Sequence, residues 1–203
     1  MEIVLFTQRV DTITTRNERR DSADQRIAEL ICTCGFLPIP TPNIPEILPE
    51  IVKKVNPAGI ILVGGNSLVK YGGDAPERDN TDRALIELSI EHDIPIFGFC
   101  RGMQSILDYF GNDLVPVTTH VAVRHIISGT EDTLEVNSYH KEACIKLRSN
   151  ELVALMRTKD GVIEKIKHKS KPIVGVMWHP EREQPFDAID ILSIRALFGG
   201  KRK

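Results

Sequence analysis

Cys100 is the residue whose neighbours most clearly point to chemistry. It lies in the run Gly98-Phe99-Cys100-Arg101-Gly102, between an apolar segment and a segment with helical spacing. Glycines two residues before and two after a nucleophile are typical of a nucleophile elbow, a turn so tight that larger side chains would collide. The peptide dipoles at the start of a helix favour a thiolate over a thiol. We therefore predict that Cys100 is a nucleophile and that the backbone N–H of Arg101 stabilises an oxyanion beside it.

A nucleophilic thiol needs a histidine, and the histidine needs a group that orients it. The segment Trp178-His179-Pro180-Glu181 follows the last strongly apolar strand segment. Pro180 favours an extended conformation at His179, and in an extended chain Glu181 projects to the same side as His179. Loops at the carboxyl ends of parallel strands gather at one edge of a sheet, so Cys100 and His179 are expected to meet there. The order Cys, His, Glu differs from that of serine-type α/β-hydrolases, whose acid precedes the histidine.

The other cysteines and histidines lack a comparable context. Cys32, Cys34 and Cys144 are interpreted as buried structural residues, and the first two face apart on a helix, which makes them a poor metal pair. His120 and His125 are five residues apart on a predicted strand, so they are expected to face opposite sides and not to share a metal. No metal site and no cofactor are predicted. Surface or hydrogen-bonded polar roles are expected for His92, His120, His125 and His168.

Apolar runs and turn residues define the elements that must position these groups. Buried strands are predicted at residues 3–6, 59–63, 94–99 and 172–178, and a short strand or extended piece at 36–40. Helices are predicted from Ser22, with a capping box to Gln25, to Cys34, at 46–55, from Asn80 or Thr81 to His92, at 102–110 and at 187–198. The polar stretch 7–21 is expected to be a loop. Short strands of an antiparallel addition are expected at 114–117, 120–127, 133–136, 144–147 and 162–166.

This alternation predicts an α/β fold with an open, mostly parallel twisted sheet, helices on both faces and a small antiparallel addition. One domain of residues 1–203 is expected. The basic end, Lys201-Arg202-Lys203, is expected to be a frayed tail.

Composition excludes several classes of protein. Apolar residues make up 41% and charged residues 27% of the 203, which argues against a disordered chain, a collagen-like repeat or a coiled coil. The formal charge of -2 argues against binding to nucleic acid or anionic lipid through net charge. No apolar run approaches the roughly 20 residues needed to cross a bilayer, and residues 1–6 do not form a signal peptide. With four sparse cysteines and no export signal, we expect a cytoplasmic protein without a disulfide framework.

Three motifs together make the sequence resemble the class I glutamine amidotransferases: residues 98–104, Gly175-Val176-Met177-Trp178-His179-Pro180-Glu181, and Leu62-Val63-Gly64-Gly65. The resemblance implies a triad of Cys100, His179 and Glu181 that cleaves a γ-glutamyl amide through a glutamyl thioester. It also implies an oxyanion hole formed by the backbone of Arg101 and of a glycine at Gly64-Gly65.

The resemblance further implies a grip on the α-amino and α-carboxyl groups of glutamate. The matching segments here are Gln104 and Val136-Asn137-Ser138-Tyr139-His140, and the latter is similar to the Asn-Ser-x-His segment of γ-glutamyl-γ-aminobutyrate hydrolases. Tyr139 and Lys141 depart from the usual form of that segment. A simple turn is the alternative interpretation of Asn137 and Ser138.

Two functions are compatible with these motifs. One is a stand-alone hydrolase that removes glutamate from a small-molecule γ-glutamyl conjugate. The other is a glutaminase subunit that delivers ammonia to a separate synthetase partner, since the chain has no room for a synthetase domain. No nucleic-acid or membrane partner is predicted.

Arginines after the first strand favour an anionic substrate. Guanidinium groups suit carboxylates and phosphates, and we hypothesise that some of them bind an anionic part of the substrate; a solvated loop with local ion pairs is the alternative. The loop resembles small stand-alone hydrolases of surface-polysaccharide (capsule) pathways, which implies a γ-glutamyl nucleotide phosphoramidate, γ-glutamyl-CDP-amidate, as a sharper candidate substrate. The arginines concerned are Arg9, Arg16, Arg19 and Arg20.

Overall fold

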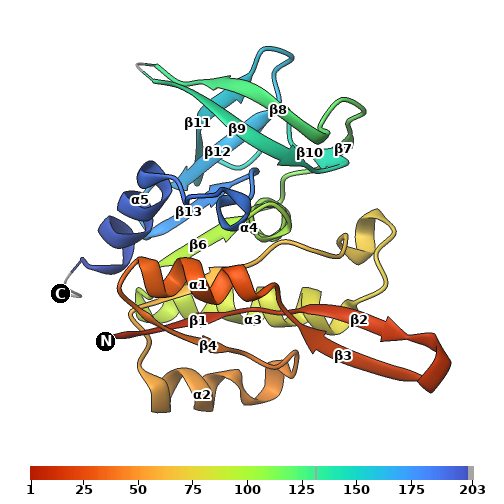
Figure 1. The fold of residues 1–203 in the computed structure, drawn as a ribbon, viewed down its shortest axis with the longest axis vertical. Helices are drawn as coiled ribbons and strands as arrows, with labels where there is room; N and C mark the ends of the chain where they lie inside the picture. The colour runs from red at the N-terminus through yellow and green to blue at the C-terminus, as the bar shows by residue number, and fades with distance from the viewer. Residues whose placement is uncertain (131, 201–203) are drawn as a thin grey trace.

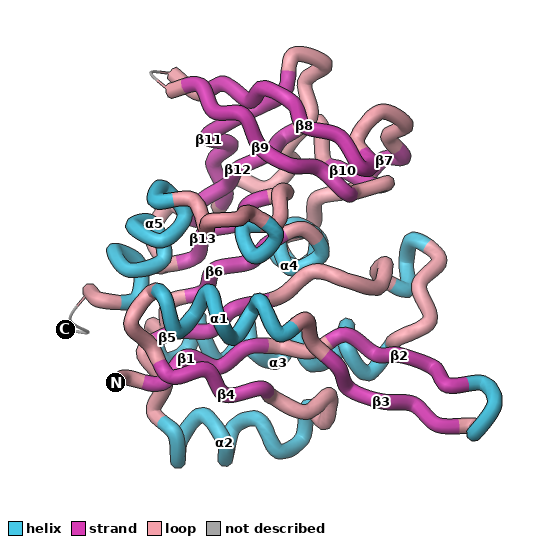
Figure 2. The backbone as a smooth tube through the Cα atoms, in the orientation of Figure 1, coloured by secondary structure: helices cyan, strands magenta, loops and turns pink. Residues whose placement is uncertain are grey.

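The computed structural model describes residues 1–130 and 132–200, so the basic end at 201–203 lies outside the described residues. The described part contains a nine-stranded sheet in the order β4-β1-β5-β6-β13-β12-β11-β8-β9 (Figures 1 and 2). Its first five strands are parallel: β4 Leu37–Pro40, β1 Ile3–Phe6, β5 Gly59–Leu62, β6 Ile96–Phe99 and β13 Ile173–Val176. The remaining four are antiparallel: β12 Ile163–His168, β11 Leu152–Thr158, β8 Val121–Ser128 and β9 Thr133–Tyr139.

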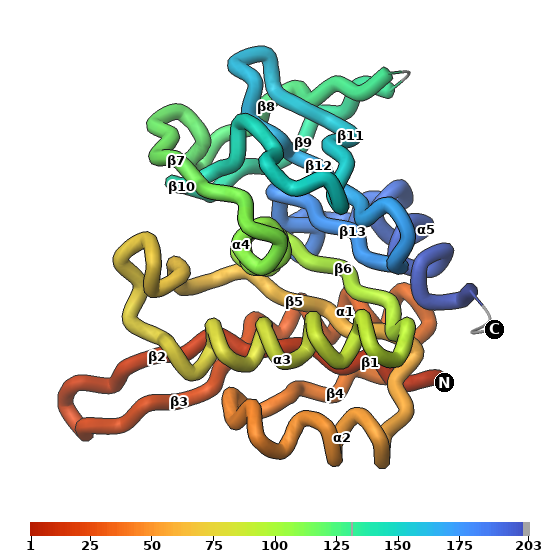
Figure 3. The backbone as a smooth tube through the Cα atoms, turned by 180° about the vertical axis from the view of Figure 1, so that it is seen from behind, coloured from red at the N-terminus to blue at the C-terminus, as the bar shows by residue number. Residues whose placement is uncertain are grey.

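The strands of the parallel half of the sheet are buried on both faces because an apolar layer covers each face. Along β1, Leu5 packs on one side, while Val4 and Phe6 pack on the other. The first layer contains α2 Leu48–Val55, α3 Pro76–His92 and α4 Arg101–Tyr109; the second contains α1 Gln25–Thr33 and α5 Ala188–Phe198. Figures 1 and 3 show this arrangement from opposite sides. The predicted α/β fold, with a mostly parallel sheet and antiparallel additions, is confirmed.

The polar stretch predicted as a loop is instead an antiparallel hairpin, β2 Arg9–Ile13 and β3 Glu18–Ser22, joined through a short 3-10 turn. The hairpin projects beyond the carboxyl end of β1 (Figure 1). Because most of its side chains are polar and at least partly exposed, it lacks the apolar alternation that signals a half-buried strand.

The predicted starts of two helices were wrong. Asp24, not Ser22, caps α1, since the Asp24 side chain accepts from the N–H of Arg26; Ser22 ends β3 and donates to Asp11. Helix α3 starts at Pro76, before Asn80 and Thr81, and proline suits the first turn because its missing N–H has no intrahelical acceptor there.

The short strands after residue 110 were predicted only in part. Residues 144–147 lie outside the strands; instead β10 Glu142–Ala143 pairs with β7 Val115–Pro116. The long strand β11 was not predicted. In the described part of the chain, no helix is both long and apolar enough to cross a bilayer.

Candidate active site

The turn between β6 and α4 has the geometry of a nucleophile elbow. Cys100 has φ +50°, a backbone conformation that is strained for a residue with a side chain. A Cβ on Gly102 would lie 2.0 Å from the carbonyl oxygen of Leu62, and one on Gly98 would lie 2.8 Å from the backbone carbon of Gly102. The flanking glycines are therefore required by backbone packing, as the sequence predicted.

His179 and Glu181 form the expected pair. The Nδ1 atom of His179 lies 2.7 Å from Oε1 of Glu181, and both residues are 4% exposed. The imidazole is enclosed by the ring of Phe99, at 5.9 Å between centroids, and by the ring of Tyr139, at 5.5 Å and 90°. Cys100 and His179 line one pocket, named here the cysteine pocket; its other lining residues include Gly65, Gln104, Tyr139, His140 and Arg182.

The electrostatics of this pair favour a protonated imidazole. Burial by itself lowers the pKa of His179. The charge of Cys100, the hydrogen bond between Cys100 and His179, and the carboxylate of Glu181 outweigh burial and raise this pKa to about 9. The site therefore favours an imidazolium beside the Cys100 sulfur, and an imidazolium can protonate a leaving nitrogen.

The strand end at Gly64-Gly65 forms the opposite wall of the site. A Cβ on Gly64 would lie 2.8 Å from the His179 ring, and Gly65 has φ +89°. The fully buried guanidinium of Arg78 donates to the carbonyl oxygens of Val63, Gly64 and Gly65. Each of these carbonyl groups shares a peptide plane with the N–H of the next residue. Arg78 therefore fixes the orientation of the N–H groups of Gly64 and Gly65, which are the predicted oxyanion donors.

The side chain of Arg101 faces away from the predicted oxyanion position. It is 1% exposed, forms ion pairs with Asp79 and Asp82 and donates to Ser105 at 3.0 Å. These contacts join the start of α4 to α3. As Arg101 is the first residue of α4, its N–H has no intrahelical acceptor and suits an oxyanion.

The residues predicted to bind the glutamyl group lie in or behind the cysteine pocket. Gln104 lines it and donates to the carbonyl oxygen of Glu142 at 2.8 Å; Tyr139 lines it as well. Asn137 instead holds the main chain of His179, accepting from its N–H and donating to its carbonyl oxygen, both at 2.9 Å. Ser138 is fully buried and donates to the carbonyl oxygen of His120. Both lie on β9 and not in a turn.

The arginines of the hairpin have separate positions. Arg9 lines a second pocket, named here the hairpin pocket, with Asp11, Asp24, Gly64, Gly65 and Arg182. Arg19 ties the hairpin to α3 through Glu77 and the carbonyl oxygen of Asp74, and Arg20 pairs with Glu18. Of the predicted set, the structure therefore brings Arg9 next to the site.

Comparison with known proteins identifies the family. The model of the family "Glutamine amidotransferase class-I" matches residues 19–191. The chain belongs to the class I glutamine amidotransferases. It is 38% identical to the γ-glutamyl-CDP-amidate hydrolase of Campylobacter jejuni, over 66% of this chain and 66% of that protein. It is 30% identical to the γ-glutamyl-γ-aminobutyrate hydrolase of Escherichia coli O157:H7, over 89% and 88% of the two chains.

A solved structure supports the fold of this amidotransferase. A GMP synthase subunit protein from Thermoplasma acidophilum superposes with a TM-score of 0.74, at 18% identity, over 98% of this chain and 94% of that chain. At this identity the likeness concerns the fold alone.

Three residues around the amidotransferase site were not predicted from the sequence. Arg182 lines both pockets, and its guanidinium stacks 4.1 Å from the centre of the Tyr139 ring. Arg26 donates to the carbonyl oxygens of Glu181 and Glu183 and so holds the loop after His179. Arg182 directly follows the His-Pro-Glu motif, and this position could have indicated its role. Arg26 and Arg78 lie far from the motifs in the sequence, so no such signal pointed to them.

Two further expectations need correction. Cys32, which was expected to be buried, is exposed. Cys34 and Cys144 are buried as expected, and burial raises the pKa of each thiol, that of Cys34 to about 11. His120 and His125 do not face opposite sides, because their ring centroids are 4.9 Å apart. The reason is a bulge at Ala122, φ +56°, where β8 gains one residue against β9; an extra residue reverses the alternation of faces.

Proposed function

We propose that this amidotransferase hydrolyses a γ-glutamyl amide bond and releases L-glutamate. The observation that carries the proposal is that His179, which is paired with Glu181, lines one pocket together with Cys100. Cys100 thiolate attacks the γ-carbonyl carbon, and the N–H groups of Arg101 and Gly65 or Gly64 hold the oxyanion. The amide C–N bond breaks as His179 protonates the leaving nitrogen, leaving a glutamyl thioester. Water loses a proton to His179, attacks the thioester and frees glutamate and the thiolate.

The more specific proposal is that the leaving group is a nucleotide phosphoramidate, so that the substrate is γ-glutamyl-CDP-amidate, used in surface-polysaccharide (capsule) biosynthesis in the cytoplasm. Its support is the Campylobacter relative and the position of the hairpin pocket, which meets the cysteine pocket at Gly65 and Arg182. A leaving group that extends from the thiol past Gly65 reaches Arg9, whose guanidinium suits phosphate. Arg9 donates to Asp11 at 2.8 Å, and Asp11 also accepts from Ser22, so these contacts hold the guanidinium at the pocket.

The test is glutamate release by the purified chain, without partners, from glutamine, γ-glutamyl-γ-aminobutyrate and γ-glutamyl-CDP-amidate. The expected order of kcat/KM places the nucleotide conjugate first. A Cys100→Ala variant releases no glutamate from any of the three, whereas Cys32→Ala, a change at an exposed cysteine, keeps the parent rates.

Other outcomes test separately the nucleotide substrate, stand-alone hydrolysis and the thioester mechanism. Preference for γ-glutamyl-γ-aminobutyrate overturns the nucleotide substrate and keeps the hydrolase. Turnover of glutamine alone overturns stand-alone conjugate hydrolysis in favour of an ammonia-delivering subunit. Glutamate release by Cys100→Ala overturns the thioester mechanism.

A further inference from the structure

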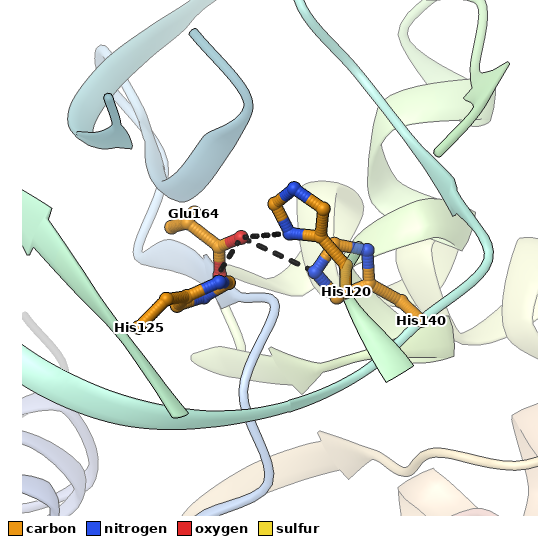
Figure 4. A group of neighbouring side chains, drawn as sticks. All are labelled: His120, His125, His140 and Glu164. Carbon is orange, nitrogen blue, oxygen red and sulfur yellow. Dashed lines mark hydrogen bonds and ion pairs between the residues drawn. The ribbon is translucent and has the colours of Figure 1, made fainter. Parts of the chain in front are cut away.

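A second cluster of chemically capable side chains lies outside the triad, in the antiparallel half of the sheet. It combines three imidazoles and one carboxylate from different strands or strand ends. His125 is on β8 and Glu164 on β12; His120 directly precedes β8, and His140 directly follows β9. Figure 4 shows a nitrogen of each imidazole directed at the carboxylate of Glu164.

The distances within the cluster are those of a compact ligand set. Oε1 of Glu164 lies 3.2 Å from Nε2 of His140, 3.4 Å from Nε2 of His125 and 3.8 Å from Nδ1 of His120. One ligand atom from each of the four residues lies within 4.8 Å of all the others. Ligand atoms around a tetrahedral zinc, with bonds of about 2.0–2.1 Å, are about 3.3 Å apart, so a small contraction brings all four to one ion.

The cluster leaves buried polar atoms without partners. His120 and His140 are 2% exposed and Glu164 is 0% exposed. Nδ1 of His120, Nε2 of His125 and Oε2 of Glu164 are all buried without a hydrogen-bond partner. Buried polar groups are normally satisfied, and a bound cation would satisfy those that point into the cluster.

Asp160 fixes the form of His120 that a metal requires. Its Oδ2 lies 2.9 Å from Nε2 of His120, and because a carboxylate accepts, a neutral His120 carries its proton on Nε2. Nδ1 then presents a lone pair toward the carboxylate of Glu164, so two acceptors face each other. This carboxylate–histidine arrangement is the outer shell found behind metal-binding histidines. Thr158 in turn donates to Asp160.

We propose that His120, His125, His140 and Glu164 bind one divalent transition-metal ion, with zinc as the ion that three imidazoles and a carboxylate suit. A hollow lined by His120, His125, Glu135 and Asp160, among others, gives the ion a path to the cluster. With four protein ligands, the ion has a structural role and takes no part in the proposed hydrolysis.

The site lies behind one wall of the cysteine pocket. His140 belongs to the metal cluster and also lines that pocket beside Tyr139. The carbonyl oxygen of His120 accepts from the N–H of His140 and from Ser138. A bound ion would therefore hold the end of β9, and with it Tyr139, at a fixed distance from β12.

The test is zinc titration of the metal-stripped full chain by calorimetry. We expect one zinc ion per chain, in the parent and equally in Cys100→Ser, which removes the competing thiol. Substitution by Co²⁺ is expected to give the visible absorption of a tetrahedral ion without a thiolate-to-cobalt charge-transfer band. Failure to bind zinc at one ion per chain, loss of binding in Cys100→Ser, or a thiolate band overturns the proposal.

Variants at partly exposed positions keep the test independent of folding. Asp160→Asn, whose side chain is 54% exposed, is expected to weaken zinc binding about 10–100-fold, and His125→Ala is expected to weaken it more. Glu135→Gln is the matched control, because Glu135 lines the same hollow but is not a ligand, and its zinc affinity should equal that of the parent. Circular dichroism without zinc checks that each variant is folded. Parent-like zinc affinity in folded His125→Ala and Asp160→Asn overturns the proposal.

Discussion

At the scale of single residues, His179 connects the charge of the site to the proposed chemistry. Its imidazolium is favoured by the negative charges of Cys100 and Glu181, which outweigh burial and place its pKa at about 9. The same proton is needed by the leaving nitrogen when the amide bond breaks. The pH dependence of the reaction is therefore set largely by the groups around this ring.

The first prediction concerns that pH dependence. We expect kcat/KM to fall as the pH rises through about 9, and Glu181→Gln to move this alkaline limb to lower pH, because the carboxylate that it removes raises the pKa of His179. Since the pKa in the fold exceeds the free value of about 6.5, protonation of His179 stabilises the fold fully below about pH 6.5, and this contribution is lost as the pH rises through about 9. Rate profiles with a γ-glutamyl amide check the shift. The control is Glu50→Gln, on the exposed surface of α2. An alkaline limb that does not move in Glu181→Gln relative to this control contradicts the prediction.

The second prediction concerns Asn137, which grips the main chain of His179 on both sides. In Asn137→Ala the imidazole loses this support, and a misplacement of about 1 Å costs on the order of 100-fold in rate. We expect kcat to fall by about that factor with little change in KM. Steady-state kinetics measure both; a raised KM at unchanged kcat would show instead that Asn137 contacts the substrate, as the resemblance implied.

At the scale of elements, the elbow depends on how closely α4 approaches β5. The third prediction is that Gly102→Ala destabilises the fold, because its Cβ would lie 2.0 Å from the carbonyl oxygen of Leu62. Overpacking of this kind costs about 1–3 kcal/mol or more. A Cβ on Gly111 would meet no atom within 4 Å. Gly111→Ala therefore loses only the free energy of backbone strain at φ +73°, about 1–2 kcal/mol. Urea unfolding compares the two variants, and an equal loss at both positions contradicts the proposed clash.

The same scale explains how much the sequence could predict. The parallel strands and the elbow were predictable because buried strands are nearly continuous apolar runs and a tight turn needs glycines. The hairpin β2–β3 was not, since its polar side chains carry no strand period. The bulge at Ala122 has no glycine to mark it, and that one extra residue turned His120 and His125 to the same face. The sequence therefore predicted that His179 pairs with Glu181 and lies beside Cys100, but it did not predict the histidine cluster.

At the scale of the whole molecule, the cysteine pocket and the hairpin pocket are both lined by Gly65 and Arg182. The formal charge of -2 provides no long-range attraction for an anionic substrate. Any attraction must come from local cations such as Arg9 and Arg182, and partly exposed cations are screened by salt over a Debye length of about 10 Å at 0.1 M. Salt dependence thus distinguishes a local anion site from general electrostatics.

The last prediction uses that distinction. With γ-glutamyl-CDP-amidate, kcat/KM is expected to fall as salt increases, whereas glutamine, which has no phosphate, is expected to show a nearly flat response. Arg9→Ala should flatten the response to the nucleotide conjugate. Arg20→Ala is the matched control, because it changes the formal charge equally but Arg20 pairs with Glu18 away from both pockets. If both variants flatten the response alike, net charge and not the hairpin pocket governs the salt effect, and Arg9 is removed from the proposed phosphate contact.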